Sequence, residues 1–132
     1  MARLYTSPPS LADVEALAAE AFATLPEAFR QMARDVPVLV QDFPDAETER
    51  EMGLQSPFDL LGLYRGVPID EKSVSATPQD LDMIFLYRRP LLDYWCETGE
   101  TLARVIRHVL IHEIGHHFGL SDDEMERIEA EA

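Results

Sequence analysis

The histidines of this chain are concentrated in one short segment. All four lie between residues 108 and 117, and His112 and His116 are four residues apart. Side chains at that spacing lie one above the other on the same face of a helix. The rise between them is about 6 Å, and two neutral imidazoles so placed can hold one zinc ion from the same side. We therefore predict that His112 and His116 are metal ligands.

Glu113 follows the first of these histidines directly. One residue along a helix corresponds to a turn of about 100°, so its carboxylate is predicted to lie beside the metal and not on it. A carboxylate in this position can take a proton from a zinc-bound water, whose pKa the metal lowers. We therefore predict that Glu113 is the general base of a hydrolytic reaction.

The two histidines leave a catalytic zinc short of one ligand, because such an ion usually has three protein ligands and one open position. Gly119 lies three residues after His116 and allows the chain to turn sharply out of the helix. Asp122, three residues further on, can then return beneath the metal as the third ligand. Asp123 competes for this role, and an acid at the start of a helix is also favoured by the helix dipole alone.

Other residues near the motif have alternative interpretations. His108 is four residues before His112, but a metal held by that pair would have no glutamate at the base position, so we expect a supporting or surface role. His117 lies off the ligand face and is expected to be hydrogen-bonded or exposed. Tyr64 and Tyr87 are candidates to contact an oxyanion, although packing is the commoner role of strand tyrosines.

The run from residue 112 to residue 122, His-Glu-x-x-His-x-x-Gly-x-x-Asp, resembles the extended metzincin signature, with aspartate where most members have histidine. Residues 61–67, 86–90 and 107–123 are similar to a family of minimal bacterial zincin-like metallopeptidases. The resemblance covers most of the chain from about residue 25 onward. It implies a reduced zincin-like fold, Zn²⁺ as the cofactor, and a zinc metallopeptidase that acts on a peptide or protein substrate.

Larger metzincins continue beyond this motif with a subdomain that walls one side of the cleft and supplies a Met-turn. Here 16 residues follow His116. Met125 is three residues after Asp122, so we interpret it as a packing residue of a helix. We therefore expect a shallow cleft, weak or narrow activity on generic proteins, and a partner or a second copy of the chain that completes the site.

Composition limits the partners and the compartment. The net charge is −14, from 11 basic and 25 acidic residues, so the surface repels a phosphate backbone and attracts divalent cations. We expect no nucleic-acid partner. The sequence contains neither a signal-peptide-like start nor a run of roughly 20 apolar residues, and we predict a cytoplasmic protein with no membrane partner. Cys96, the single cysteine, is expected to be a small buried apolar residue.

The elements around the motif predict an α+β fold, in which a small mixed sheet packs on helices and the zinc-binding helix lies near the C-terminus. We expect a single zincin-like domain over residues 1–132, with residues 1–9 as a flexible tail. Hydrophobic periodicity and capping signals predict helices at 11–24, 26–32 and 45–52, strands at 36–43, 60–67 and 83–89, a loop at 68–80, and C-terminal helices that follow Thr98 and Ser121.

The strand at residues 83–88 has a second possible role. Arg88 and Arg89 follow its apolar core, and charged residues often protect an exposed sheet edge from aggregation. An exposed edge can also align an extended peptide as an added strand. We therefore expect residues 83–88 to form the edge strand beside the site.

Two other functions are compatible with the same residues. A zinc-stabilised binding module without catalysis would have a fourth protein ligand in place of water. A metal-dependent endoribonuclease is the second alternative, because some of these enzymes have a similar spacing of histidines and glycine. The net charge of −14 and the glutamate at position 113 both argue against the second alternative.

Overall fold

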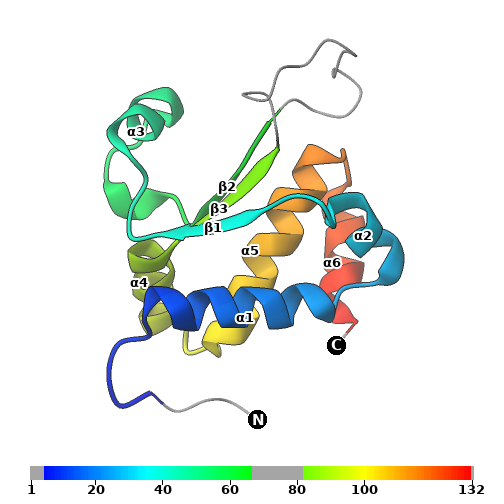
Figure 1. Cartoon of the computed structure of the whole chain (residues 1–132), viewed down its shortest axis with the longest axis horizontal. Helices are drawn as coiled ribbons and strands as arrows, with labels where there is room; N and C mark the ends of the chain where they lie inside the picture. Colours follow the sequence, from blue (N-terminus) through cyan, green and yellow to red (C-terminus); the bar gives the residue numbers. More distant parts are fainter. Residues whose placement is uncertain (1–4, 67–81, 132) are drawn as a thin grey trace.

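The computed structural model describes residues 5–66 and 82–131, and within them it has the predicted α+β architecture (Figure 1). The loop predicted at residues 68–80 lies outside the described residues. The elements, in chain order, are α1 (Leu11–Ala23), α2 (Glu27–Ala33), β1 (Val38–Gln41), α3 (Ala46–Met52), a 3₁₀ turn (Pro57–Asp59), β2 (Gly62–Arg65), β3 (Met83–Tyr87), α4 (Arg88–Thr98), α5 (Leu102–His117) and α6 (Asp122–Ala130).

The described strands form one mixed sheet in the order β1-β3-β2, with β1 parallel and β2 antiparallel to β3. Ile84 of β3 pairs with Val38 on one side and with Tyr64 on the other. The prediction that residues 83–88 form an edge strand is therefore wrong, because β3 is the central strand. Among the strands that the structure describes, β2 is the antiparallel edge strand.

The charges that suggested an edge belong instead to the first turn of α4. The Arg88 guanidinium donates hydrogen bonds to the Pro9 carbonyl at 2.6 Å and to Asp42 Oδ1 at 3.1 Å. The Arg89 guanidinium lies 5.5 Å from the centre of the Phe43 ring. Both arginines therefore attach α4 to neighbouring segments of the chain, and neither protects an edge of the sheet.

The hydrophobic core lies where α1 and α5 cross and pack against the sheet (Figure 1). Leu17 of α1, Ile106 of α5 and Leu86 of β3 are each at most 3% exposed. Burying an aliphatic side chain of this size contributes about 1.5–3 kcal/mol relative to leaving it exposed. The predicted apolar stripes of α1 and α5 thus meet each other, and this contact fixes the position of α5 beneath the strands.

Most helix boundaries follow from short-range capping. The predicted start of α1 is confirmed, because Ser10 and Asp13 form a reciprocal capping box. The predicted start of α5 at Thr98 is wrong: Thr98 is the last residue of α4, and Thr101 caps α5 by accepting a hydrogen bond from Arg104 N–H at 3.2 Å. Cys96 lies on α4 and is exposed, so its predicted burial is also wrong.

The link between α5 and α6 follows the predicted pattern. Gly119 has a φ of 74°, a left-handed conformation that ends α5 and redirects the chain. Ser121 then caps α6, and Met125 packs against Gly115 with its side chain fully buried. A Cβ atom at Gly115 would lie 2.4 Å from Met125 Sδ, so the glycine permits this close approach of the two helices. The packing role predicted for Met125 is confirmed.

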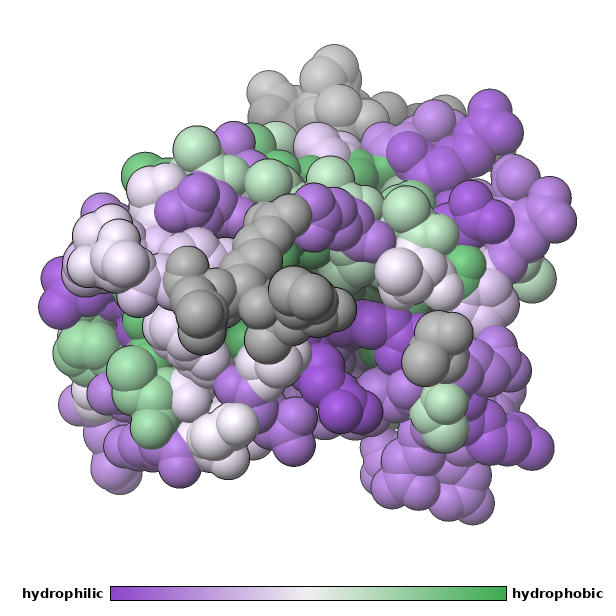
Figure 2. All heavy atoms as spheres, turned by 90° about the horizontal axis from the view of Figure 1, so that it is seen from below, coloured by the Kyte–Doolittle hydropathy of each residue, from purple (hydrophilic) through white to green (hydrophobic). Residues whose placement is uncertain are grey.

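One face of the molecule carries many polar side chains. Hydrophilic side chains cover much of the face that Figure 2 shows, with hydrophobic ones scattered between them. Among residues 5–66 and 82–131, none of the helices combines the length and the apolar content needed to cross a bilayer.

Candidate metal centre

Three of the histidines of α5, His108, His112 and His116, lie on the face of this helix that is turned away from the core. The rings of His112 and His116 have centroids 5.9 Å apart, and those of His108 and His112 are 4.1 Å apart. The three side chains therefore form a ladder along one face, as their spacing requires. The opposite face is buried and consists of Leu102, Val105, Ile106, Val109, Leu110, Ile111 and Ile114.

Glu113 contacts the free edge of β2. Its Oε1 accepts a hydrogen bond from Tyr64 N–H at 3.1 Å. Leu61 accepts a hydrogen bond from Tyr87 N–H, and the alternation of an antiparallel pair then directs Tyr64 N–H away from β3. The carboxylate that follows the first histidine of the motif is thus held beside the backbone of an edge strand.

The surroundings of Glu113 and His112 shift both groups toward their neutral forms. Burial raises the pKa of the Glu113 carboxyl, and the Tyr64 hydrogen bond and the electrostatic influence of His116 lower it by less. Burial is also the main cause that lowers the pKa of His112, and His108 adds to this effect. A neutral imidazole has a free lone pair on one nitrogen, so the neutral form of histidine is the one that binds a metal.

The Nε2 atom of His112 is the most direct indication of a ligand. This atom is buried and has no hydrogen-bond partner among residues 5–66 and 82–131, and Glu129 Oε2 lies 3.8 Å from it. An unpaired buried polar atom destabilises a fold by about 1–3 kcal/mol. Coordination of a cation would satisfy it, and imidazoles with carboxylates are a donor set that zinc accepts. The residues of this site therefore fit a zinc ion.

The structure brings together a different trio from the predicted one. Within residues 5–66 and 82–131, the group whose ligand atoms all lie within 4.8 Å of one another is His108, His112 and Glu129. Asp122, the first residue of α6, is exposed and close enough to His112 to raise its pKa. His116 is exposed and, like Asp122 and its neighbour Asp123, lies outside that group.

Sequence reasoning missed Glu129, although its position carries a signal. Glu129 is seven residues after Asp122, and two turns of a helix place such residues on the same face. The face of α6 that presents Asp122 toward His112 therefore also presents Glu129. The motif ends at residue 122, so Glu129 lies outside it and the motif pattern does not indicate this second acidic residue.

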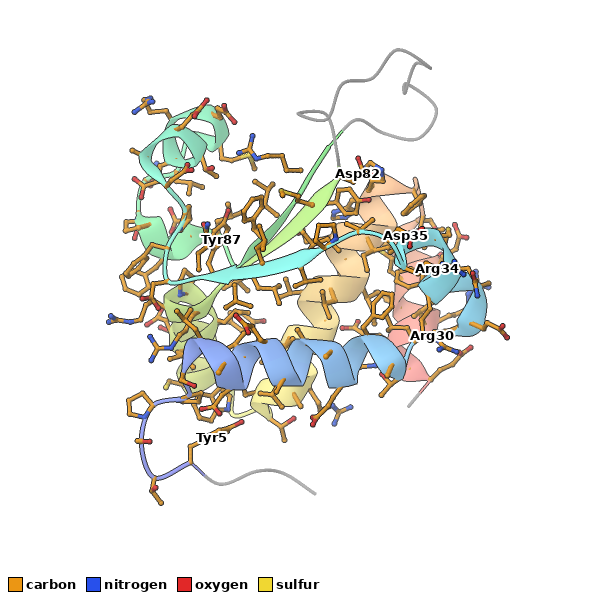
Figure 3. All side chains as sticks on the ribbon, viewed as in Figure 1. Tyr5, Arg30, Arg34, Asp35, Asp82 and Tyr87 are labelled. Carbon is orange, nitrogen blue, oxygen red and sulfur yellow. The ribbon has the colours of Figure 1, made fainter. Side chains whose placement is uncertain are left out.

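A second cluster attaches the end of α5 to the sheet. The rings of Tyr64 and His117 are stacked with centroids 3.9 Å apart. Tyr64 donates a hydrogen bond to Asp82 Oδ2 at 3.0 Å, and His117 Nε2 lies 3.5 Å from the same oxygen. Figure 3 shows Asp82 at the start of β3, beside the end of α5. These contacts hold Tyr64 in place, and with it the backbone N–H group that donates a hydrogen bond to Glu113.

The two tyrosines are engaged in contacts within the protein. Burial and the Asp82 hydrogen bond raise the pKa of the Tyr64 phenol, which favours its neutral form. Tyr87 is 1% exposed and lies on the face of the sheet turned away from the main core, where its ring stacks with that of Phe85 at 6.3 Å between centroids (Figure 3). His117 is 4% exposed and paired with its neighbours, in agreement with the expectation that it lies off the ligand face.

A His-Glu-x-x-His helix that packs on a mixed sheet, with its glutamate at an antiparallel edge strand, defines the class of zincin-type proteins. The model of the zincin-like metallopeptidase family matches residues 33–132, so this chain belongs to that family. Membership implies zinc as the cofactor and a peptide as the substrate. The chain matches no curated protein.

Proposed function

We propose that this protein is a zinc-dependent peptidase in which His112, His116 and Asp122 hold the metal and Glu113 is the general base. The observation that carries the proposal is the position of the Glu113 carboxylate. It lies one residue from a ligand histidine and 3.1 Å from the outward N–H of an edge strand. A base at that place can serve both a metal site and a peptide backbone aligned with the strand.

Zinc bound by these residues would act as a Lewis acid, which makes a water more acidic and a carbonyl more electrophilic near neutral pH. Glu113 takes one proton from the attacking water as the new carbon–oxygen bond forms. It then returns that proton to the amine nitrogen as the carbon–nitrogen bond breaks. The raised pKa of the Glu113 carboxyl makes it a stronger base than an exposed glutamate, which favours the first of these transfers.

The edge of β2 provides a template for the substrate. The outward backbone groups of Gly62 and the outward carbonyl of Tyr64 can pair with an extended peptide, which adds a strand to the sheet beside the Tyr64 N–H group that is bonded to Glu113. A peptide in this position passes directly beside Glu113. This role replaces the one expected for residues 83–88, whose backbone is already paired on both sides.

The test is the Glu113→Gln variant, assayed for zinc content and for hydrolysis of a library of internally quenched peptides. We expect zinc content to be unchanged and turnover to fall by about 100-fold or more, because the amide cannot accept the proton. Glu97→Gln, an exposed glutamate of α4, is the matched control and should retain full activity. Turnover by Glu113→Gln equal to that of the unaltered protein would refute the assignment.

A further inference from the structure

A cluster of ligand-type side chains lies one turn along α5 from the predicted metal site. The two oxygens of Glu129 face two different histidines: Oε1 contacts His108 Nδ1, and Oε2 lies 3.8 Å from His112 Nε2. The ligand atoms of the three residues all lie within 4.8 Å of one another. The function proposed above gives no role to His108 or Glu129.

The spacing of these atoms suits a divalent cation. In tetrahedral coordination, ligand atoms about 2.1 Å from zinc are about 3.4 Å from each other. The separation of 3.8 Å between His112 Nε2 and Glu129 Oε2 is close to that value. Small rotations of the side chains would be enough to gather all three around one ion.

Arg107 holds Glu129 in this position. Its guanidinium donates hydrogen bonds to the carbonyls of Ile128, Glu129 and Glu131, at 3.2, 2.9 and 2.6 Å respectively. Its Nε also donates to Thr24 Oγ1 at 3.0 Å, which connects the group to the end of α1. The hydrogen bonds from the Arg107 side chain thus fix the last turn of α6 against α5. They hold the carboxylate of Glu129 next to the histidines.

The cluster is also accessible. His108 and Glu129 form part of the wall of an open hollow of about 910 Å³ between α5, α4 and the end of α6. The side chains of His108, Glu129 and His112 are 47%, 28% and 24% exposed. The cluster therefore extends from the surface at His108 to the buried Nε2 atom of His112. A hydrated cation can therefore reach these ligands from solvent.

We propose that His108, His112 and Glu129 form a second zinc site that excludes metal from the site of the His-Glu-x-x-His motif. The exclusion rests on the ligand role proposed above for His112. Its Nε2 has one lone pair and can bind one ion at a time, and both sites require it. The chain therefore holds a single zinc in either of two positions, and zinc at the second one is displaced by a helical turn from His116.

Mutual exclusion has a consequence for metal loading. When two sites compete for one shared ligand, the ratio of their occupancies at saturation equals the ratio of their affinities. Additional zinc does not change that ratio. At saturation, a constant fraction of the protein therefore holds its zinc in the second site, away from the general base. Excess zinc cannot fill both sites of one molecule and does not shift zinc from one site to the other.

The test measures zinc binding to the full-length chain by competition with a chromophoric chelator. The double variant His116→Ala/Asp122→Asn lacks the motif ligands, and we expect it to bind one zinc. Adding Glu129→Gln should weaken that binding by about tenfold or more, whereas adding Glu126→Gln, a matched change on α6 outside the cluster, should not. The unaltered protein should bind one zinc, and His112→Ala none.

Three results would overturn the proposal: no zinc in the folded double variant, equal effects of Glu129→Gln and Glu126→Gln, or two zinc ions in the unaltered protein. Circular dichroism establishes that each variant is folded. If the double variant does not fold, the ¹⁵N resonances of the histidine rings in the unaltered protein decide the question. Those of His108 should shift on addition of one equivalent of zinc, and unshifted resonances would overturn the proposal. None of these readouts depends on peptide hydrolysis.

Discussion

His112 is the middle one of three histidines that are spaced four residues apart on α5. Burial lowers its pKa, so its lone pair is available near neutral pH, and in the part of the chain that the structure describes its Nε2 has no hydrogen-bond partner. His116 lies one turn beyond it and His108 one turn before it. The two proposed metal sites differ in which of these neighbours joins His112, and loss of His112 alone removes both.

Gly62 shows how a residue without a side chain positions the site. A Cβ atom at this position would lie 2.7 Å from Val109 Cγ1 and 3.0 Å from the Phe85 carbonyl oxygen. A glycine inside a strand permits the close approach of another segment, and the structure shows such an approach here. It allows β2 to lie directly on α5, which brings Tyr64 N–H within reach of Glu113.

We therefore predict that Gly62→Ala destabilises the fold by about 1–3 kcal/mol, because the added methyl group overpacks the contact between β2 and α5. Val109→Ala should relieve part of this effect by removing the nearest atom, so the double variant should be less destabilised than the sum of the two single variants. Urea unfolding of all four proteins measures the coupling. Additive effects, to within about 0.5 kcal/mol, would show that the methyl group does not meet Val109.

At the scale of elements, α6 depends on one side chain of α5. Arg107 donates hydrogen bonds to the carbonyls of Ile128 and Glu129 in the last turn of α6 and to that of Glu131, the residue that follows the helix. Met125 secures the middle of the same helix against Gly115. The position of Asp122 and Glu129 relative to His112 thus follows from the way α6 is attached along its length.

We predict that Arg107→Ala destabilises the protein by about 1–3 kcal/mol through the loss of these hydrogen bonds, of which those to Ile128 and Glu129 are partly buried. Arg104→Ala is the control, because Arg104 makes an exposed ion pair with Glu100 at 3.8 Å and its loss should change stability by less than about 0.5 kcal/mol. Hydrogen exchange should show faster opening of the amides of α6 in Arg107→Ala alone. Equal exchange rates in the two variants would show that Arg107 does not secure the helix.

The sequence predicted elements well where short-range chemistry decides them. The capping boxes at Ser10 and Ser121 and the left-handed Gly119 each depend on residues within one turn of the chain. Thr98 misled because it also has the side chain of a helix cap, and the actual end of α4 depends on Gly99, which has a φ of 73°. The central position of β3 depends on which strands pair, and no local pattern encodes that.

The same distinction applies to the site. The ladder of histidines follows from spacing within one helix and was predictable. The contact between Glu113 and Tyr64 joins residues 49 positions apart, and that between His108 and Glu129 joins residues 21 apart. Such contacts depend on how α5 packs against β2 and α6. The residues that surround a motif are therefore harder to predict than the motif.

At the scale of the whole molecule, the net charge of −14 attracts any divalent cation, so metal binding alone does not establish a site. A diffuse attraction acts on Mg²⁺ and Zn²⁺ alike, whereas a site of imidazoles and a carboxylate prefers zinc. The two effects can be separated by comparing the metals and by removing the ligand that both proposed sites share.

We predict that Zn²⁺ at about 100 times its dissociation constant stabilises the folded protein by about 2.7 kcal/mol. For a domain of this size the gain corresponds to a rise of about 10 °C in Tm. Differential scanning fluorimetry should show this rise, its reversal by a chelator, and little effect of Mg²⁺ at the same concentration. His112→Ala should lose the rise, whereas Glu113→Gln should retain it. A rise in His112→Ala equal to that in the unaltered protein would place the zinc at other acidic groups and contradict both proposed sites.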